Sequence, residues 1–103
     1  MHTLTLYIPE THLEHVKAAI FAAGAGRHGA YDCCCWQTLG QGQFRPLEGS
    51  NPAVGERGVT AVVPEYRVET LCCDDAIPAV TAAIRAAHPY EEPAFAFTPA
   101  RIA

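Results

Sequence analysis

The chain is poor in charged residues, and most of all in cationic ones. Only 17% of its 103 residues are Asp, Glu, Lys or Arg, and seven Lys and Arg against eleven acids give a formal charge of −4. The cations are scattered along the sequence, so it lacks the basic stripe on which nucleic-acid affinity usually depends. We therefore expect no nucleic-acid partner.

Long apolar runs and targeting signals are also missing. No apolar segment approaches the roughly 20 residues that a membrane-spanning helix needs. Residues 1–4 lack the basic start and the cleavage site of a signal peptide. These two absences predict a cytoplasmic protein with no membrane partner.

The five cysteines have neither the number nor the spacing of a structural framework. An odd count with three adjacent, residues 33–35, suits reduced thiols better than disulfides, and no C-x-x-C spacing typical of structural zinc occurs. We expect these side chains to pack in the core, as cysteines commonly do. The alternative is a zinc or copper site, because Cys33 and Cys35 would share one face of a strand and His28 could join them.

Apolar residues, in contrast, are abundant and make up half of the chain. A chain of this length buries only roughly two-thirds of the surface that its unfolded state exposes. It therefore has more hydrophobic material than a small monomer can easily hide, and self-association would cover the excess.

A repeated segment divides the chain into two similar halves. The sequence VKAAIFAA at 16–23 returns as VTAAIRAA at 80–87, with six of eight positions identical. Each half has the pattern of a strand, a helix and a second strand. Two such units in about one hundred residues predict the order βαββαβ.

Hydrophobic periodicity and helix-stop signals place the individual elements. The expected strands cover 3–8, 30–39, 65–73 and 93–98, and the expected helices cover 10–23 and 74–88. The second helix must end at His88, because Pro89 disfavours helical geometry in the residue before it. Right-handed crossovers then predict a single domain, 1–103, with the α+β ferredoxin-like fold: a four-stranded antiparallel sheet with both helices on one face.

Such a sandwich leaves the other face of the sheet uncovered. We expect this face to carry part of the aromatic surplus, including Tyr7 and Tyr66. Covering it with a symmetric partner is the simplest solution, so a homo-oligomer is predicted.

One long irregular segment, at about 40–58, separates the second and third expected strands. Loops of this length in a compact domain are usually functional or disordered. Phe44 and Pro46 are residues that pack, and Arg45 with Glu48 can form a hydrated pair. We expect an ordered excursion that contacts a neighbouring subunit or a ligand, and the alternative is a solvated hairpin extension.

The segment 88–94, HPYEEPA, ends the second half and is held by two prolines with fixed φ. Glu91 and Glu92 are adjacent in an extended chain and point to opposite faces, so they are poorly placed for joint acid and base chemistry. We expect Tyr90 to pack and one carboxylate to accept backbone or arginine donors. His88, beside a helix end, is expected to be a surface or capping group.

These motifs resemble those of a known family. GQFRPLEG at 42–49, followed by Asn51-Pro52 and later by HPYEEPA at 88–94, is similar to the insert domain of the YqfO-type members of the Nif-three-like family, often called GTP cyclohydrolase I type 2 homologues. The likeness runs from about residue 4 to residue 98. The YEEP turn also resembles the corresponding turn of CutA proteins, which share this fold and form trimers.

The resemblance implies a fold and a binding surface, and it gives no reason to expect cyclohydrolase activity. In the larger relatives this domain interrupts a metal-binding core, whereas the chain matches the insert alone and lacks the histidine and carboxylate cluster of that core. It therefore predicts an oligomeric cytoplasmic binding or regulatory module, a trimer by analogy with CutA, that takes a small anionic ligand. The expected ligand or interface residues are Phe44, Arg45, Pro46, Glu48, His88, Tyr90, Glu91 and Glu92. The alternatives are a metal-binding protein that uses the cysteines and an enzyme with an intersubunit active site.

Overall fold

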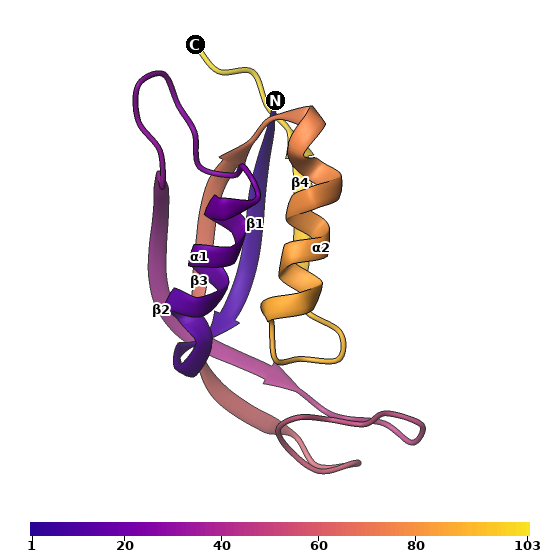
Figure 1. Cartoon of the computed structure of the whole chain (residues 1–103). Helices are drawn as coiled ribbons and strands as arrows, with labels where there is room; N and C mark the ends of the chain where they lie inside the picture. Colours follow the sequence, from indigo (N-terminus) through magenta and orange to yellow (C-terminus); the bar gives the residue numbers. More distant parts are fainter.

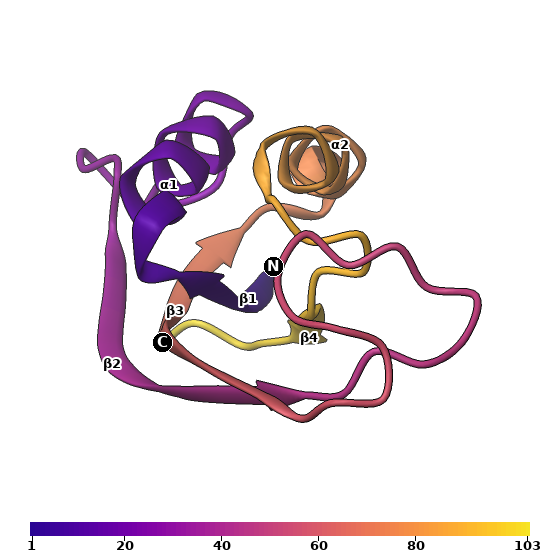
Figure 2. The same ribbon diagram turned by 90° about the horizontal axis from the view of Figure 1, so that it is seen from below.

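The computed structural model describes residues 1–103 as four strands and two α-helices in the order βαββαβ (Figure 1). The elements are β1 (His2–Pro9), α1 (Leu13–Ala22), β2 (Cys35–Phe44), β3 (Ala61–Cys72), α2 (Ile77–Ala87) and β4 (Phe95–Pro99). The strands form one sheet in the order β2-β3-β1-β4, and every neighbouring pair is antiparallel. Both helices lie on the same face of this sheet (Figure 2). The predicted ferredoxin-like α+β sandwich is confirmed.

The internal repeat supplies the two halves of the core. Val16 and Ile20 on α1, and Val80 and Ile84 on α2, are fully buried and lie 64 residues apart in pairs (80 − 16 = 84 − 20 = 64). The same offset relates the buried face of β1 to that of β3: Leu4, Leu6 and Ile8 correspond to Val68, Thr70 and Cys72. Burial of each large aliphatic side chain contributes about 1.5–3 kcal/mol relative to its exposure. The apolar core between sheet and helices therefore stabilises both halves in the same way.

Short 3₁₀ turns and glycines set the helix ends. Each helix is preceded by a 3₁₀ turn that carries acidic residues, Glu10–His12 before α1 and Asp74–Ala76 before α2, where carboxylates suit the positive end of the helix dipole. After α1 the chain passes through Gly24 with φ 117° and Gly26 with φ 80°, values that favour glycine. Neither helix has both the length and the apolar character required to cross a lipid bilayer.

The hairpin of β2 and β3 differs from its predicted bounds. β2 begins at Cys35, five residues after the predicted start, because residues 28–31 form a tight turn and Cys33 has a left-handed φ of 55°. It then continues through the segment predicted as a loop, pairing residue by residue with β3 as far as Phe44 opposite Ala61. The irregular connection is therefore 45–60, which we call the hairpin loop. The hairpin projects beyond the rest of the sheet (Figure 1).

The uncovered face of the sheet carries Tyr7, paired with Arg67 on β3, and Trp36, paired with Glu69. Tyr7 and Trp36 are 40% and 63% exposed. The placement of Tyr66 on this face was wrong. Tyr66 alternates with Arg67 along β3, so its ring lies on the helix side and packs against the core.

Candidate functional site

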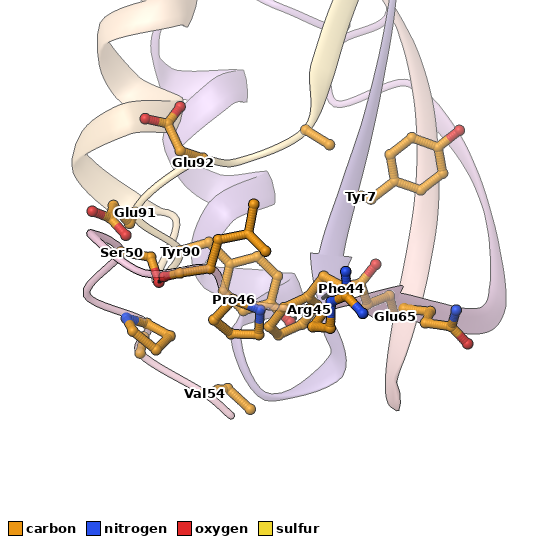
Figure 3. A pocket seen from close by; sticks show the side chains of 15 residues that line it. Tyr7, Phe44, Arg45, Pro46, Ser50, Val54, Glu65, Tyr90, Glu91 and Glu92 are labelled. Carbon is orange, nitrogen blue, oxygen red and sulfur yellow. Dashed lines mark hydrogen bonds between the residues drawn. The ribbon is translucent and has the colours of Figure 1, made fainter. Parts of the chain in front are cut away.

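A pocket of about 430 Å³ lies where the hairpin loop meets residues 88–94, which we call the corner (Figure 3). Tyr7 on β1 and Glu65 on β3 form its floor. The remaining wall comes from the hairpin loop and the end of β2, and much of it is apolar: Phe44, Pro46, Leu47, Pro52, Ala53 and Val54. Two segments about 40 residues apart in sequence thus enclose one cavity.

Tyr90 joins the corner to the hairpin. Its hydroxyl donates a hydrogen bond to Oε2 of Glu65 at 3.0 Å, and its ring lies 5.6 Å from that of Phe44 between centroids. Burial and the Glu65 carboxylate raise the pKa of Tyr90 above its ordinary value of 10. The phenol therefore remains a proton donor across the physiological range.

His88, the first residue of the corner, links it to β1. The backbone N–H of Tyr90 donates to Nδ1 of His88 at 3.1 Å, so the other ring nitrogen, Nε2, carries the proton and donates to the carbonyl oxygen of Tyr7 at 2.8 Å. The residue is only 6% exposed, and the pKa of His88 is lowered, chiefly by burial and also by His12, although the Tyr7 carbonyl and the Glu65 carboxylate act to raise it. The predicted surface position was wrong, although the residue does cap α2, with its N–H donating to the carbonyl of Ile84 at 2.8 Å. The imidazole is neutral, and both of its nitrogens are used within the chain.

The hairpin loop is held to the corner and to itself by hydrogen bonds. The N–H of Asn51 donates to Oε2 of Glu91 at 3.0 Å, which is the backbone contact expected of one corner carboxylate. Within the loop, Nε of Arg57 donates to the carbonyl of Ser50 at 2.7 Å, and the N–H of Gly58 donates to that of Pro46 at 2.7 Å. These contacts preorganise the outer wall of the pocket.

A glycine on β2 makes room for the floor of the pocket. A Cβ placed on Gly42 would collide with the carboxyl group of Glu65, whereas a Cβ on Gly40 would meet nothing within 4 Å. The Glu65 side chain therefore lies across the backbone at Gly42, and this position lets it reach the hydroxyl of Tyr90. Two glycines that resemble each other in sequence thus have different roles.

The structure brings together most, but not all, of the predicted site residues. Phe44, Arg45, Pro46, Tyr90, Glu91 and Glu92 line the pocket, whereas Glu48 is exposed outside it and His88 lies behind Tyr90. Sequence reasoning missed Tyr7 and Glu65, which lie on strands and reach the pocket only through the tertiary fold. The glycine pattern at the end of β2 was a signal for Glu65, since a glycine in a strand often marks a close approach.

Charge within the pocket is predominantly negative. The lining includes the carboxylates of Glu65, Glu91 and Glu92 but a single guanidinium, that of Arg45, so its formal charge is −2. Arg45 forms no ion pair with Glu48, Glu91 or Glu92. The ion pairs of the chain all involve other cationic groups. Both Arg45 and Glu92 are exposed and have no side-chain partner.

The cysteines do not have the geometry assumed for a metal site. Cys33 lies in the turn before β2 with its left-handed backbone, while Cys35 is in the strand and packs against the core, so the two do not share a strand face. His28 is exposed in the turn at 28–31. All five thiols are unpaired, and no group of three or more His, Cys, Asp or Glu side chains is placed to hold a metal ion.

The sandwich and its hairpin place the chain among proteins with the CutA-like fold. The periplasmic divalent cation tolerance protein CutA from Archaeoglobus fulgidus aligns with 99% of this chain and 85% of its own, with a TM-score of 0.69 and 12% identity. At that identity the likeness is one of fold alone.

Sequence comparison is more specific. A GTP cyclohydrolase 1 type 2 homolog of Mycobacterium leprae is 49% identical over 90 residues, which are 87% of this chain and 23% of the relative. The homolog of Bacillus subtilis is 41% identical over 96 residues, 93% of this chain and 26% of the relative. A Bacillus cereus protein related to NIF3 aligns with 96% of this chain and 25% of its own, with 35% identity and a TM-score of 0.82. No family model matches the chain.

The resemblance to the Nif-three-like proteins is therefore confirmed in sequence and in fold. The chain spans about a quarter of the length of the relatives it matches. It is homologous to one domain-sized segment of the GTP cyclohydrolase 1 type 2 homologs, and that segment has a CutA-like fold.

Proposed function

We propose that this chain is an oligomeric binding module of regulatory type, which takes a small molecule in the pocket between hairpin loop and corner. The observation that carries the proposal is the pocket itself. Its volume of about 430 Å³ falls in the range of about 300–1,000 Å³ typical of small-molecule sites, and its lining combines an apolar wall with a few polar groups.

The rigidity of the pocket supports a binding role. The bonds of Tyr90 to Glu65 and of Asn51 to Glu91 tie its two walls together before any ligand arrives. A preorganised site loses less conformational entropy on binding than a mobile one. Binding is proposed in preference to catalysis, because His88, the histidine of the corner, has both ring nitrogens in internal hydrogen bonds.

The charge of the pocket lining limits the charge that a ligand can carry. A purely anionic ligand, as the sequence led us to expect, would meet three carboxylates and one guanidinium. Coulomb repulsion from the excess negative charge opposes such a ligand. A molecule that carries a positive group fits this pocket better.

Self-association is supported by exposed apolar side chains on the hairpin. Leu39, Val62 and Trp36 are 54%, 55% and 63% exposed. β2 is also an edge strand of ten residues, with one side of its backbone unpaired. A second copy of the chain would cover both features, and the trimer implied by the CutA resemblance is the arrangement we propose. Five unpaired thiols suit a reducing compartment such as the cytoplasm.

Thermal melting with a library of small molecules tests the binding role. A bound ligand stabilises the folded state, so true ligands raise the melting temperature, and at a given concentration a tighter ligand raises it more. An Ala53→Trp variant fills the pocket from the exposed side of the loop, and Ala18→Trp, on the exposed face of α1, is its matched control. Ligands of the pocket should stabilise the parent and Ala18→Trp but not Ala53→Trp. Equal stabilisation of both variants, or none in the parent, would rule out this site.

A further inference from the structure

Two opposite charges in the pocket have no partner within the chain. Arg45 and Glu92 line it, and neither makes an ion pair or a side-chain hydrogen bond. Glu65 and Glu91, in contrast, are already acceptors, from the hydroxyl of Tyr90 and the N–H of Asn51. The pocket therefore offers one free guanidinium and one free carboxylate.

These two groups come from different walls. Figure 3 shows Glu92 on the corner and Arg45 on the hairpin, with Pro46 and Tyr90 drawn between them. Tyr90 and Pro46 line the same pocket, so an aromatic ring and a proline are available beside the two charges. Leu47 and Val54 extend the apolar lining on the loop side.

We propose that the ligand of this pocket is an α-amino acid with an aromatic or large aliphatic side chain. This inference rests on the proposed binding function and names its ligand class. The α-carboxylate would be held by the planar fork of Arg45, which suits two parallel hydrogen bonds to a carboxylate. The α-ammonium would lie toward Glu92, within the negative field of the neighbouring Glu91.

Simpler ligands satisfy only half of this arrangement. A carboxylate without an amine engages Arg45 but is repelled by the excess of acids, and an amine without a carboxylate leaves Arg45 unpaired. A zwitterion satisfies both groups and brings no net charge. An apolar side chain on the ligand then removes the aromatic and proline surfaces from water, which favours binding.

Isothermal titration calorimetry with three related probes tests the assignment. L-phenylalanine is compared with 2-phenylethylamine, which lacks the carboxylate, and with 3-phenylpropanoate, which lacks the amine. Each analogue should bind at least tenfold more weakly than the amino acid, since each loses one charge-assisted contact. Binding of either analogue as tight as that of L-phenylalanine would overturn the proposal.

Two variants assign the contacts. Arg45→Gln should lower the affinity for L-phenylalanine at least tenfold and leave the affinity for 2-phenylethylamine unchanged. Glu92→Gln should lower the affinity for L-phenylalanine and for 2-phenylethylamine, but not that for 3-phenylpropanoate. Arg101→Gln near the C-terminus and Glu56→Gln on the loop, both exposed and outside the pocket, are the matched controls and should bind as the parent does. Parent-like affinity in the two pocket variants would place the amino acid elsewhere and overturn the assignment.

The failures of the two proposals are distinguishable. If L-phenylalanine and L-leucine do not bind at millimolar concentration while other molecules stabilise the parent and not Ala53→Trp, the amino-acid inference falls and the binding function stands. If no molecule of either set binds, both fall. All variant sites are exposed, and the melting temperature of each variant without ligand verifies that it folds.

Discussion

Two residues, His88 and Tyr90, hold the corner in place through contacts that no local pattern in the sequence reveals. The imidazole bridges the backbone of the corner and the end of β1, and the phenol bridges the corner and β3. Each side chain has more than one partner, so the loss of either should affect both stability and the shape of the pocket.

Removal of the Tyr90 hydroxyl should destabilise the protein without disturbing its core. Tyr90→Phe keeps the ring against Phe44 but leaves Glu65 without its donor, so we expect the free energy of unfolding in urea to fall by about 1 kcal/mol. Tyr31→Phe is the control, since Tyr31 is 75% exposed. Equal stability of the two variants would show that the contact with Glu65 contributes nothing.

Acidification should weaken the fold through His88. Because burial lowers the pKa of His88 below its ordinary value of 6.5, the unfolded chain takes up a proton more readily than the native one. Stability is therefore fully present above pH 6.5 and declines as the pH falls through 6.5 toward the lower native pKa, with a limiting slope of about 1.4 kcal/mol per pH unit for one proton. The Glu65 carboxylate favours the imidazolium and narrows the pH interval over which this stability is lost, whereas His12 opposes the imidazolium and widens that interval.

Urea unfolding at pH 7.5, 6.5 and 5.5 measures the effect. His88→Gln should be less stable at pH 7.5 but lose less on acidification, while His15→Gln, on the exposed side of α1, should keep the slope of the parent. A parent-like slope in His88→Gln would mean that the titration belongs to another group.

At the scale of elements, the hairpin of β2 and β3 is the part that departs from a minimal ferredoxin-like sandwich. The hairpin extends beyond the sheet and places the hairpin loop beside the corner (Figure 1). The end of β2 and the hairpin loop thereby form one wall of the pocket. Close packing of β2 on the Glu65 side chain sets where that wall lies.

Alanine at the two glycines of β2 should separate packing from strand propensity. Gly42→Ala forces the Glu65 carboxyl group away from Tyr90 and should lower the free energy of unfolding by about 1–2 kcal/mol. Gly40→Ala has open space around it and should be neutral or slightly stabilising, because it reduces the freedom of the unfolded chain. In a Tyr90→Phe background the cost of Gly42→Ala should shrink, since both changes break the same contact. Additive costs, or equal behaviour of the two alanine variants, would contradict this account.

At the scale of the whole molecule, the main open question is what covers the apolar side chains that the core does not bury. The core lies between the sheet and the two helices, while Trp36 and Tyr7 remain on the open face. Half of the residues are apolar, and a chain of this size has only one core in which to place them.

Light scattering coupled to size exclusion should give a mass that is a multiple of 11.1 kDa, three times that value for the proposed trimer. Trp36→Glu puts a charge on the open face beside the unpaired edge and should reduce the mass at micromolar concentration. Tyr31→Glu is the control, because Tyr31 is equally aromatic and exposed but lies in the turn before β2. A monomeric parent would refute the oligomer, and equal effects of both variants would refute this interface.

The sequence by itself determined the order of the elements, the ferredoxin-like arrangement and most of the core. Those features follow from hydrophobic periodicity, which depends on neighbours within a few residues, and from the repeat at 16–23 and 80–87, which can be read directly from the sequence. It also indicated the two segments that form the pocket, since a long loop and a proline-bounded turn are visible as local composition. The expectation that the cysteines pack in the core was wrong for most of them, because Cys72 alone is buried and Cys33 and Cys73 are exposed.

Only the tertiary structure decided what those segments contact. Glu65 and Tyr7 enter the site because the pairing of β1 with β3 and the position of the hairpin loop bring them there, and the buried His88 donates to the carbonyl of Tyr7 at the end of β1. Arg45, which the sequence allowed to pair with a nearby acid, is left without a partner. Such contacts join residues that are tens of positions apart, and their free energies depend on distance and burial in the folded chain, which the order of residues does not display.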